Sequence, residues 1–223
     1  MTRKTHSTAN SPNRRRAGRP KDADKRDAVL AAAVRLFFQH GFDGVSVEAV
    51  AREAHVSKVT VYGHFGDKES LFREAISRET AQMRRSISQL PEDAEGLRST
   101  LIGIGMGMMR FLMRPEVLAV ERVIAVQGQQ HPELVQAFFE AGPWAVCNWL
   151  CQQLEALQRQ GLLVMPDILS ASDQLVGMWQ GMLIKELRMG IRPVPDEEAL
   201  HAHVSAAVDT FLRAYGAQSA ARK

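Results

Sequence analysis

The sequence predicts an all-helical protein, with a small N-terminal helical module followed by a larger C-terminal helical bundle. Two observations predict this class. Apolar residues recur at helical spacing through most of the chain, and Gly, Pro or Asp stands at nearly every break between the periodic segments. No segment shows the alternation with turn signals that is typical of a half-buried strand.

The first 21 residues differ from the rest in composition. They are rich in Ser, Thr, Asn, Pro and Arg and contain almost nothing to bury, which predicts a disordered basic arm. Residues 1–26 hold nine basic and two acidic side chains, a net charge of +7, whereas the whole chain carries +3, so the remainder carries −4. A basic arm on a mildly acidic body indicates a polyanionic partner, although a solvated tail would have the same composition.

The cysteines and the hydropathy indicate a compartment. Cys147 and Cys151 lie four residues apart in a predicted helix, where parallel side-chain directions disfavour a disulfide. Small buried residues are the favoured interpretation, with a redox sensor as the alternative. No apolar run reaches the roughly 18–20 residues of a membrane span, and the N-terminus lacks the apolar segment of a secretory signal. We therefore expect a cytoplasmic protein with no membrane partner.

The N-terminal module contains short helices separated by tight breaks. A first helix from Asp22 should end before Gly41, and a long helix should stop only at Pro91. Three residues are predicted N-caps: Ser46, Ser57 and Asp67. Three short helices within about 45 residues can form a helix-turn-helix, whose second helix enters a DNA groove.

Residues 22–76 resemble the N-terminal DNA-binding domain of the TetR family of bacterial regulators. The resemblance is carried by LFFQHGF at 36–42, VSVEAVAREA at 45–54, VSKVTVYGHF at 56–65 and DKESLF at 67–72. Two positions depart from the family pattern. His55 stands at the break where the family usually has Gly, and Gly63 lies inside the recognition helix where larger residues are common.

The resemblance implies which residues bind DNA. They are Val47, Glu48, Lys58, Val59, Thr60, Tyr62, Gly63, His64 and Lys68. Tyr62, His64 and Lys68 are the candidates for phosphate contacts, and Lys58 and Thr60 for base edges. Taken singly, each phosphate candidate could instead pack, cap a helix or be solvated. In the arm, Arg19 within Gly-Arg-Pro resembles a minor-groove AT-hook, with nonspecific charge as the alternative.

The C-terminal part shows no catalytic arrangement of Ser, His and Asp, no His-Glu-x-x-His and no Cys/His cluster. We therefore expect no enzyme activity, no cofactor and no metal. Six helices are expected, at 97–113, 116–129, 132–141, 143–160, 168–190 and 196–215. Gly103, Gly105 and Gly107 are expected to permit close helix packing or flexibility.

This part more loosely resembles the AefR-type C-terminal domain, through RVIA at 122–125, HPEL at 131–134 and AGP at 141–143. The resemblance implies an apolar ligand pocket and a dimer interface. Met and Trp suit an adaptable pocket, although the default place for such residues is the core. The pocket candidates are Met109, Phe111, Met113, Phe138, Trp144, Trp149, Met178, Trp179 and Met182.

The last two helices are the expected dimer interface, with burial against the same chain as the alternative. Their apolar positions are Val176, Trp179, Leu183, Leu187, Leu200, Val204, Val208, Phe211 and Leu212. The predicted organisation is an arm at 1–21, a DNA-binding domain at 22–83 and a ligand-binding and dimerisation domain at 84–223. The predicted function is a homodimeric repressor, released from a pseudo-palindromic double-stranded DNA operator by a small, largely apolar effector.

Two other functions remain open at this point. The chain could be a helical ligand-binding protein or enzyme whose N-terminal module serves dimerisation. It could also be an architectural protein that binds DNA without sequence preference.

Overall fold

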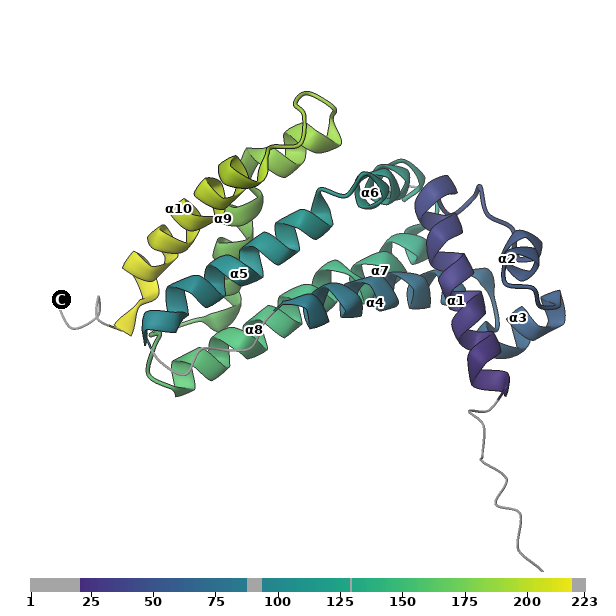
Figure 1. The fold of residues 1–223 in the computed structure, drawn as a ribbon, viewed down its shortest axis with the longest axis horizontal. Helices are drawn as coiled ribbons and strands as arrows, with labels where there is room; N and C mark the ends of the chain where they lie inside the picture. The colour runs from purple at the N-terminus through teal and green to yellow at the C-terminus, as the bar shows by residue number, and fades with distance from the viewer. Residues whose placement is uncertain (1–20, 88–93, 129, 218–223) are drawn as a thin grey trace, which may run out of the picture.

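The computed structural model describes residues 21–87, 94–128 and 130–217. These residues form ten α-helices and no strand beyond an isolated bridge, which confirms the all-helical class. The helices are α1 (Lys21–His40), α2 (Val47–Glu53), α3 (Lys58–Phe65), α4 (Lys68–Ser86), α5 (Ala94–Leu112), α6 (Pro115–Gln127), α7 (Pro132–Ala141), α8 (Pro143–Arg159), α9 (Ile168–Arg188) and α10 (Glu197–Tyr215). Figure 1 shows α1–α3 at one end of an elongated molecule and α8–α10 at the other.

The predicted helix starts are confirmed by side-chain caps. The Oγ atoms of Ser46 and Ser57 each accept a backbone N–H three residues on, both at 3.1 Å. The carboxylate of Asp67 accepts the Ser70 N–H at 2.6 Å. Each cap satisfies a donor that the first helical turn leaves without a partner. The caps therefore mark where α2, α3 and the long α4 begin.

Two predicted boundaries are wrong. The long helix α4 does not continue to Pro91 but ends at Ser86, because Ile87 adopts an extended conformation (φ −88°, ψ 123°). The Ile87 side chain instead packs on α5, where a Cβ at Gly107 would lie 2.8 Å from its Cγ1. Helix α5 begins at Ala94 rather than at Leu97, so residues expected in the linker form its first turn.

The hydrophobic core consists of two clusters. One joins α5, α8, α9 and α10 around the fully buried Trp179. The other joins α1–α4 with α6 and α7, and includes Val120, Ile124 and Phe138. The second cluster thus contains residues from both sides of the expected domain boundary at residue 83. The N-terminal module shares its interior with α6 and α7.

The cluster around Trp179 depends on a glycine. A Cβ built at Gly105 would lie 2.7 Å from Trp179 Nε1 and 2.7 Å from Val204 Cγ1, so α5 can approach α9 and α10 only without a side chain there. The predicted close-packing role is therefore confirmed for Gly105.

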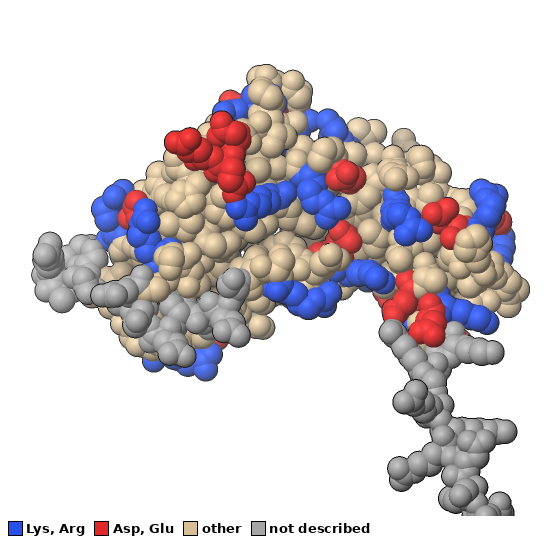
Figure 2. Space-filling view, in the orientation of Figure 1, with Lys and Arg blue, Asp and Glu red and all other residues tan. Residues whose placement is uncertain are grey.

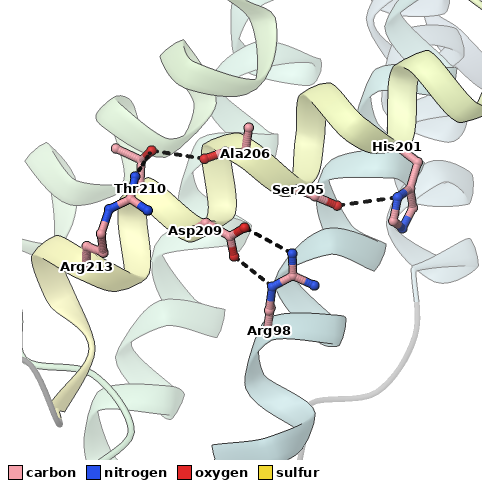
Figure 3. Close-up of polar contacts among 7 residues, drawn as sticks. All are labelled: Arg98, His201, Ser205, Ala206, Asp209, Thr210 and Arg213. Atoms are coloured by element: carbon pink, nitrogen blue, oxygen red, sulfur yellow. Dashed lines mark hydrogen bonds and ion pairs between the residues drawn. The ribbon is translucent and has the colours of Figure 1, made fainter.

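Polar contacts also join α5 to α10. Arg98 of α5 donates two hydrogen bonds to the Asp209 carboxylate of α10, at 2.7 and 3.1 Å (Figure 3).

We expect Gly105→Ala to lower the free energy of unfolding by about 1–3 kcal/mol, because the added methyl overpacks a filled core. Gly103 is the matched control, since it lies two residues away on α5 and a Cβ there would meet nothing within 4 Å. Gly103→Ala should raise stability by up to about 1 kcal/mol through helix propensity. Urea denaturation measures both. Equal effects at the two positions would contradict the packing argument.

Helix α9 is kinked, whereas the sequence predicted a continuous helix. Gly181 has φ 46° and ψ −142°, a conformation that only glycine adopts without strain. Two residues before this break, the Trp179 carbonyl oxygen lies 2.8 Å from His203 Nε2 of α10. This hydrogen bond joins α10 to α9 beside the kink.

The apolar residues predicted for the dimer interface lie inside the protomer. Seven of the nine are buried against the same chain, and Val176 and Leu212 pack on that core. The alternative interpretation is therefore confirmed for these side chains. The outer surface of α9 presents other residues, among them Leu169 at 59% exposed and Met182 at 61%.

Candidate nucleic-acid interface and ligand cavity

Helices α2 and α3 form the helix-turn-helix predicted from the sequence. The turn between them places His55 in the left-handed region, with φ 55°. The Val56 N–H closes the turn by donating to the Ala51 carbonyl at 2.9 Å. On α3, Val61 and Phe65 are buried and hold the helix on the core. This packing fixes which face of α3 points outward.

The outward face of α3 carries several of the predicted DNA-binding residues. Val59 is 80% exposed and Tyr62 is 42% exposed. A Cβ at Gly63 would meet nothing within 4 Å, so this position is open. Thr60 Oγ1 lies 2.8 Å from Ser57 Oγ at the N-terminus of the helix. The surface is therefore shaped by Tyr62 and Val59 with a gap at Gly63.

Lys58, Glu48 and Tyr62 form a cluster on this face. The Lys58 ammonium pairs with the Glu48 carboxylate and lies 5.5 Å from the centre of the Tyr62 ring. The hydrogen bond from Lys58 lowers the pKa of Glu48 below its usual value, and the same bond raises the pKa of Lys58. Both side chains are about half exposed, so the pair can open when a phosphate or a base edge competes for the ammonium.

Three other predicted contacts are placed differently. The Val47 side chain is only 5% exposed and packs in the core, because it occupies the first inward position of α2. The His64 side chain is 14% exposed, with Nε2 at 3.4 Å from Asp22 Oδ1 of α1. Lys68 Nζ lies 4.2 Å from the centre of the Phe42 ring, and burial lowers the pKa of this lysine. Lys68 is half-buried rather than extended toward solvent.

The start of α1 lies against the end of the recognition helix. Asp22 reaches His64, and the Arg26 guanidinium lies 5.1 Å from the centre of the Phe65 ring while pairing with Glu74. The basic arm, with its predicted contact Arg19, lies outside the described residues. It joins the described chain at Lys21, directly beside α3. Figure 2 shows basic and acidic side chains intermixed on the face in view, with no continuous basic surface.

We expect Glu48→Gln to strengthen binding to random DNA by about three- to ten-fold at low salt, since it removes a carboxylate and releases Lys58. The slope of log affinity against log salt should steepen by about 1. Glu53→Gln is the control, because Glu53 lies on the same helix but pairs with Arg35 of α1 at 2.9 Å. Fluorescence anisotropy measures both variants. An unchanged salt slope for Glu48→Gln would show that the pair with Glu48 does not keep Lys58 from binding phosphate.

A cavity of about 660 Å³ lies between the helix-turn-helix module and the bundle. This volume is within the range of small-molecule sites. Residues of α1, α4, α5, α6, α7, α8 and α9 line it. The lining is mostly apolar and includes four phenylalanines: Phe38, Phe111, Phe138 and Phe139.

Two of the nine predicted pocket residues, Phe111 and Phe138, line this cavity. The other seven do not, for two reasons. Five of them belong to the bundle core or pack on it, which is the default place for apolar residues: Met109, Met113, Trp149, Met178 and Trp179. Trp144 and Met182 point outward and are 52% and 61% exposed.

The polar groups of the cavity are the part that the sequence did not reveal. Arg188 of α9 donates from Nε and Nη2 to both oxygens of Glu121 on α6, at 2.6 and 2.9 Å. The Glu121 side chain is 13% exposed, and burial raises its pKa although Arg188 opposes the shift. Glu79, 11% exposed, accepts from Arg114 at 2.8 Å. One signal was present: Glu121 is the sole acid at 117–126, where all other residues except Arg122 are apolar.

Cys147 also lines the cavity, and Cys151, one turn on along α8, does not. Burial raises the pKa of the Cys147 thiol. Both cysteines are free. Within the described part of the chain, no group of His, Cys, Asp and Glu side chains could hold a metal ion, and no helix combines the length and apolarity needed to cross a bilayer.

Comparison with known proteins assigns both parts of the chain. Residues 29–75 match the family model of bacterial regulatory proteins of the tetR family. Residues 99–217 match the C-terminal domain of AefR-like transcriptional repressors. Among curated proteins, the repressor AcnR of Corynebacterium efficiens is 27% identical over 113 residues, which are 51% of this chain and 55% of that protein. The chain thus spans about half the length of the curated relatives it matches.

Solved structures match over a longer span. The flavonoid-responsive regulator FrrA is 30% identical, with a TM-score of 0.70, over 87% of this chain and 98% of FrrA. A TetR transcriptional regulator from Agrobacterium tumefaciens is 25% identical, with a TM-score of 0.73, over 89% of this chain and 97% of that chain. The helix-turn-helix, the bundle and both family models agree, and this chain belongs to the TetR family of bacterial regulatory proteins.

Proposed function

We propose that this protein is a sequence-specific, DNA-binding transcriptional repressor that leaves its operator when a small, largely apolar ligand binds. Its role is regulatory rather than catalytic. The DNA-binding unit is residues 22–83, the unit at 84–223 binds the ligand and forms the homodimer, and the arm at 1–21 adds contacts to double-stranded DNA.

One observation carries this proposal: the cavity is walled by the DNA-binding module itself. Phe38 of α1 and Ile76 and Thr80 of α4 line it, opposite residues of α6 and α7. A ligand that fits only one arrangement of these helices changes the position of α1 and α4, and hence of α3. It shifts the equilibrium by its difference in affinity for the two arrangements.

The similarity to FrrA supports an effector of this kind, since FrrA is a flavonoid-responsive regulator. A cavity with four phenylalanines suits a flat aromatic molecule. We therefore propose an aromatic compound as the effector.

The dimer is proposed to form through the outer faces of α9 and α10. On α9 this face presents Gly177 and the exposed Met182, and on α10 it presents Ala202 and Ala206. Small residues permit close approach of paired helices. Such a dimer would place two recognition helices about 34 Å apart, one turn of DNA, on a pseudo-palindrome.

The decisive experiment is binding of the purified protein to its own upstream DNA and to random DNA between about 50 and 200 mM salt. We expect affinity for the upstream DNA at least about 10³-fold higher. Equal, steeply salt-dependent affinity for both would favour an architectural binder. Absence of binding to either would favour a ligand-binding protein whose N-terminal module serves dimerisation.

A further inference from the structure

The chemistry of the cavity narrows the class of ligand, and this inference rests on the proposed function. Three charged side chains line the cavity among the described residues: Glu79, Glu121 and Arg188. The Glu121 carboxylate pairs with Arg188, and the Glu79 carboxylate pairs with Arg114 at 2.8 Å, so each carboxylate already has a guanidinium partner. The rest of the lining is mostly apolar, with Thr80 and Gln180 as neutral polar side chains.

The guanidinium in this set is already engaged. Arg188 uses Nε and Nη2 to bind both oxygens of Glu121. A ligand carboxylate could take Arg188 only by displacing Glu121, whose side chain is 13% exposed and would be left as a buried charge without a partner. An acidic ligand is therefore opposed by this exchange.

A neutral hydroxyl can bind without breaking the pair. Each carboxylate oxygen has capacity for a further hydrogen bond, and Arg188 has N–H groups besides the two that bind Glu121. A hydroxyl would donate to Glu121 and accept from Arg188. Hydrogen bonds to ionised partners are roughly twice as strong as those between neutral groups.

The walls favour an aromatic carrier for this hydroxyl. Phe38 of α1, Phe111 of α5 and the adjacent Phe138 and Phe139 of α7 line the same space. Phe138 and Phe139 lie edge to face, with ring centres 5.8 Å apart. Aromatic pairs in such arrangements gain energy beyond the area they bury.

We propose that the effector is a neutral phenol, whose ring lies among the phenylalanines and whose hydroxyl bridges Glu121 and Arg188. The bridge ties α6 to α9 through the ligand. Helix α6 also packs on α1, and its Val123 lies against Gly41, the residue that follows α1. The hydroxyl thus binds on the helix through which the bundle contacts α1.

Three probes of one shape test the proposal by calorimetry on the full chain without DNA: para-phenylphenol, para-methoxybiphenyl and biphenyl-para-carboxylate. We expect the phenol to bind about ten-fold more tightly than either of the others, because only it donates to Glu121 while remaining neutral. Tighter binding of the carboxylate, or equal binding of the phenol and its methyl ether, would overturn the proposal.

Two variants locate the hydroxyl. Glu121→Gln should lower the affinity for the phenol about five-fold, because a neutral acceptor replaces an ionised one. The affinity for the methyl ether should stay unchanged. Glu116→Gln, on the exposed face of the same helix, should change neither affinity. Equal losses for both ligands in Glu121→Gln would overturn the bridge.

A third measurement does not depend on a variant that folds. Saturating para-phenylphenol should slow alkylation of Cys147, which lines the cavity, but not of Cys151, which does not. An unchanged rate of Cys147 alkylation would contradict binding of the phenol in this cavity. None of these measurements contains DNA, so they test the ligand class separately from the repressor mechanism. If the phenol binds but does not release DNA, only the repressor mechanism is contradicted. If the protein binds DNA but shows no preference for the phenol, only the ligand class is contradicted.

Discussion

Replacing Arg188 by leucine is expected to lower the free energy of unfolding by about 2–3 kcal/mol at neutral pH, because it leaves the Glu121 carboxylate buried without its partner. Loss of one member of a fully buried pair costs about 3–5 kcal/mol. The smaller value is expected here because the Arg188 side chain is 39% exposed, so solvent screens part of the interaction. Urea denaturation at pH 7 measures the loss.

The same variant should show a defined pH dependence. Burial already raises the pKa of Glu121 in the native protein, and removal of Arg188 removes the group that opposes this shift. A carboxyl whose pKa is higher folded than unfolded binds more protons in the folded state, so stability falls as pH rises between the two values. The deficit of Arg188→Leu should therefore shrink as pH falls toward about 4.3, the pKa of an unfolded glutamate.

A double variant separates the ion pair from the loss of side-chain packing. Glu121→Met combined with Arg188→Leu replaces both charges by apolar side chains, a change that is often neutral or stabilising. We expect the double variant to regain most of the stability and to lose the pH dependence. If it were as unstable as Arg188→Leu at every pH, the unpaired carboxylate could not be the cause.

The helix-turn-helix was predictable from local signals. Ser46, Ser57 and Asp67 cap their helices through contacts only three residues away, and such contacts follow from the order of residues along the chain. The left-handed His55 was likewise predictable as the break between two short helices. The length of α4 was not, because Ile87 leaves the helix to pack on a residue of α5 that is distant in the sequence.

The cavity could not be predicted for the same reason. Trp179 and Met109 have the size and softness of pocket residues, but whether an apolar side chain fills a core or lines a space depends on how helices from distant parts of the chain come together. The pair of Glu121 and Arg188 joins residues 67 positions apart. Sequence showed an acid in an apolar helix, yet only the fold showed its partner.

The N-terminal arm is expected to supply the largest single share of DNA affinity. Residues 1–20 carry six basic and no acidic side chains, so the rest of the chain has a net charge of −3. Six Gln substitutions test the arm without shortening it: Arg3, Lys4, Arg14, Arg15, Arg16 and Arg19. If about half of them reach phosphates, the slope of log affinity against log salt should fall by about 3, and affinity at 50 mM salt by roughly a thousand-fold.

A charge-preserving variant distinguishes groove contact from simple attraction. Replacing the four arginines at 14–16 and 19 by lysine keeps the charge of the arm but removes the guanidinium groups that insert into a narrow minor groove. If Arg19 lies in the groove, the lysine variant should keep the salt slope and lose preference for A·T pairs beside the operator. If only electrostatic attraction to the phosphates operates, the lysine variant should bind DNA as the native protein does. If the variant with the neutral glutamine arm kept the salt slope of the native protein, both models would be excluded. The phosphate contacts would then be assigned to the helix-turn-helix, where Lys58 lies next to Glu48.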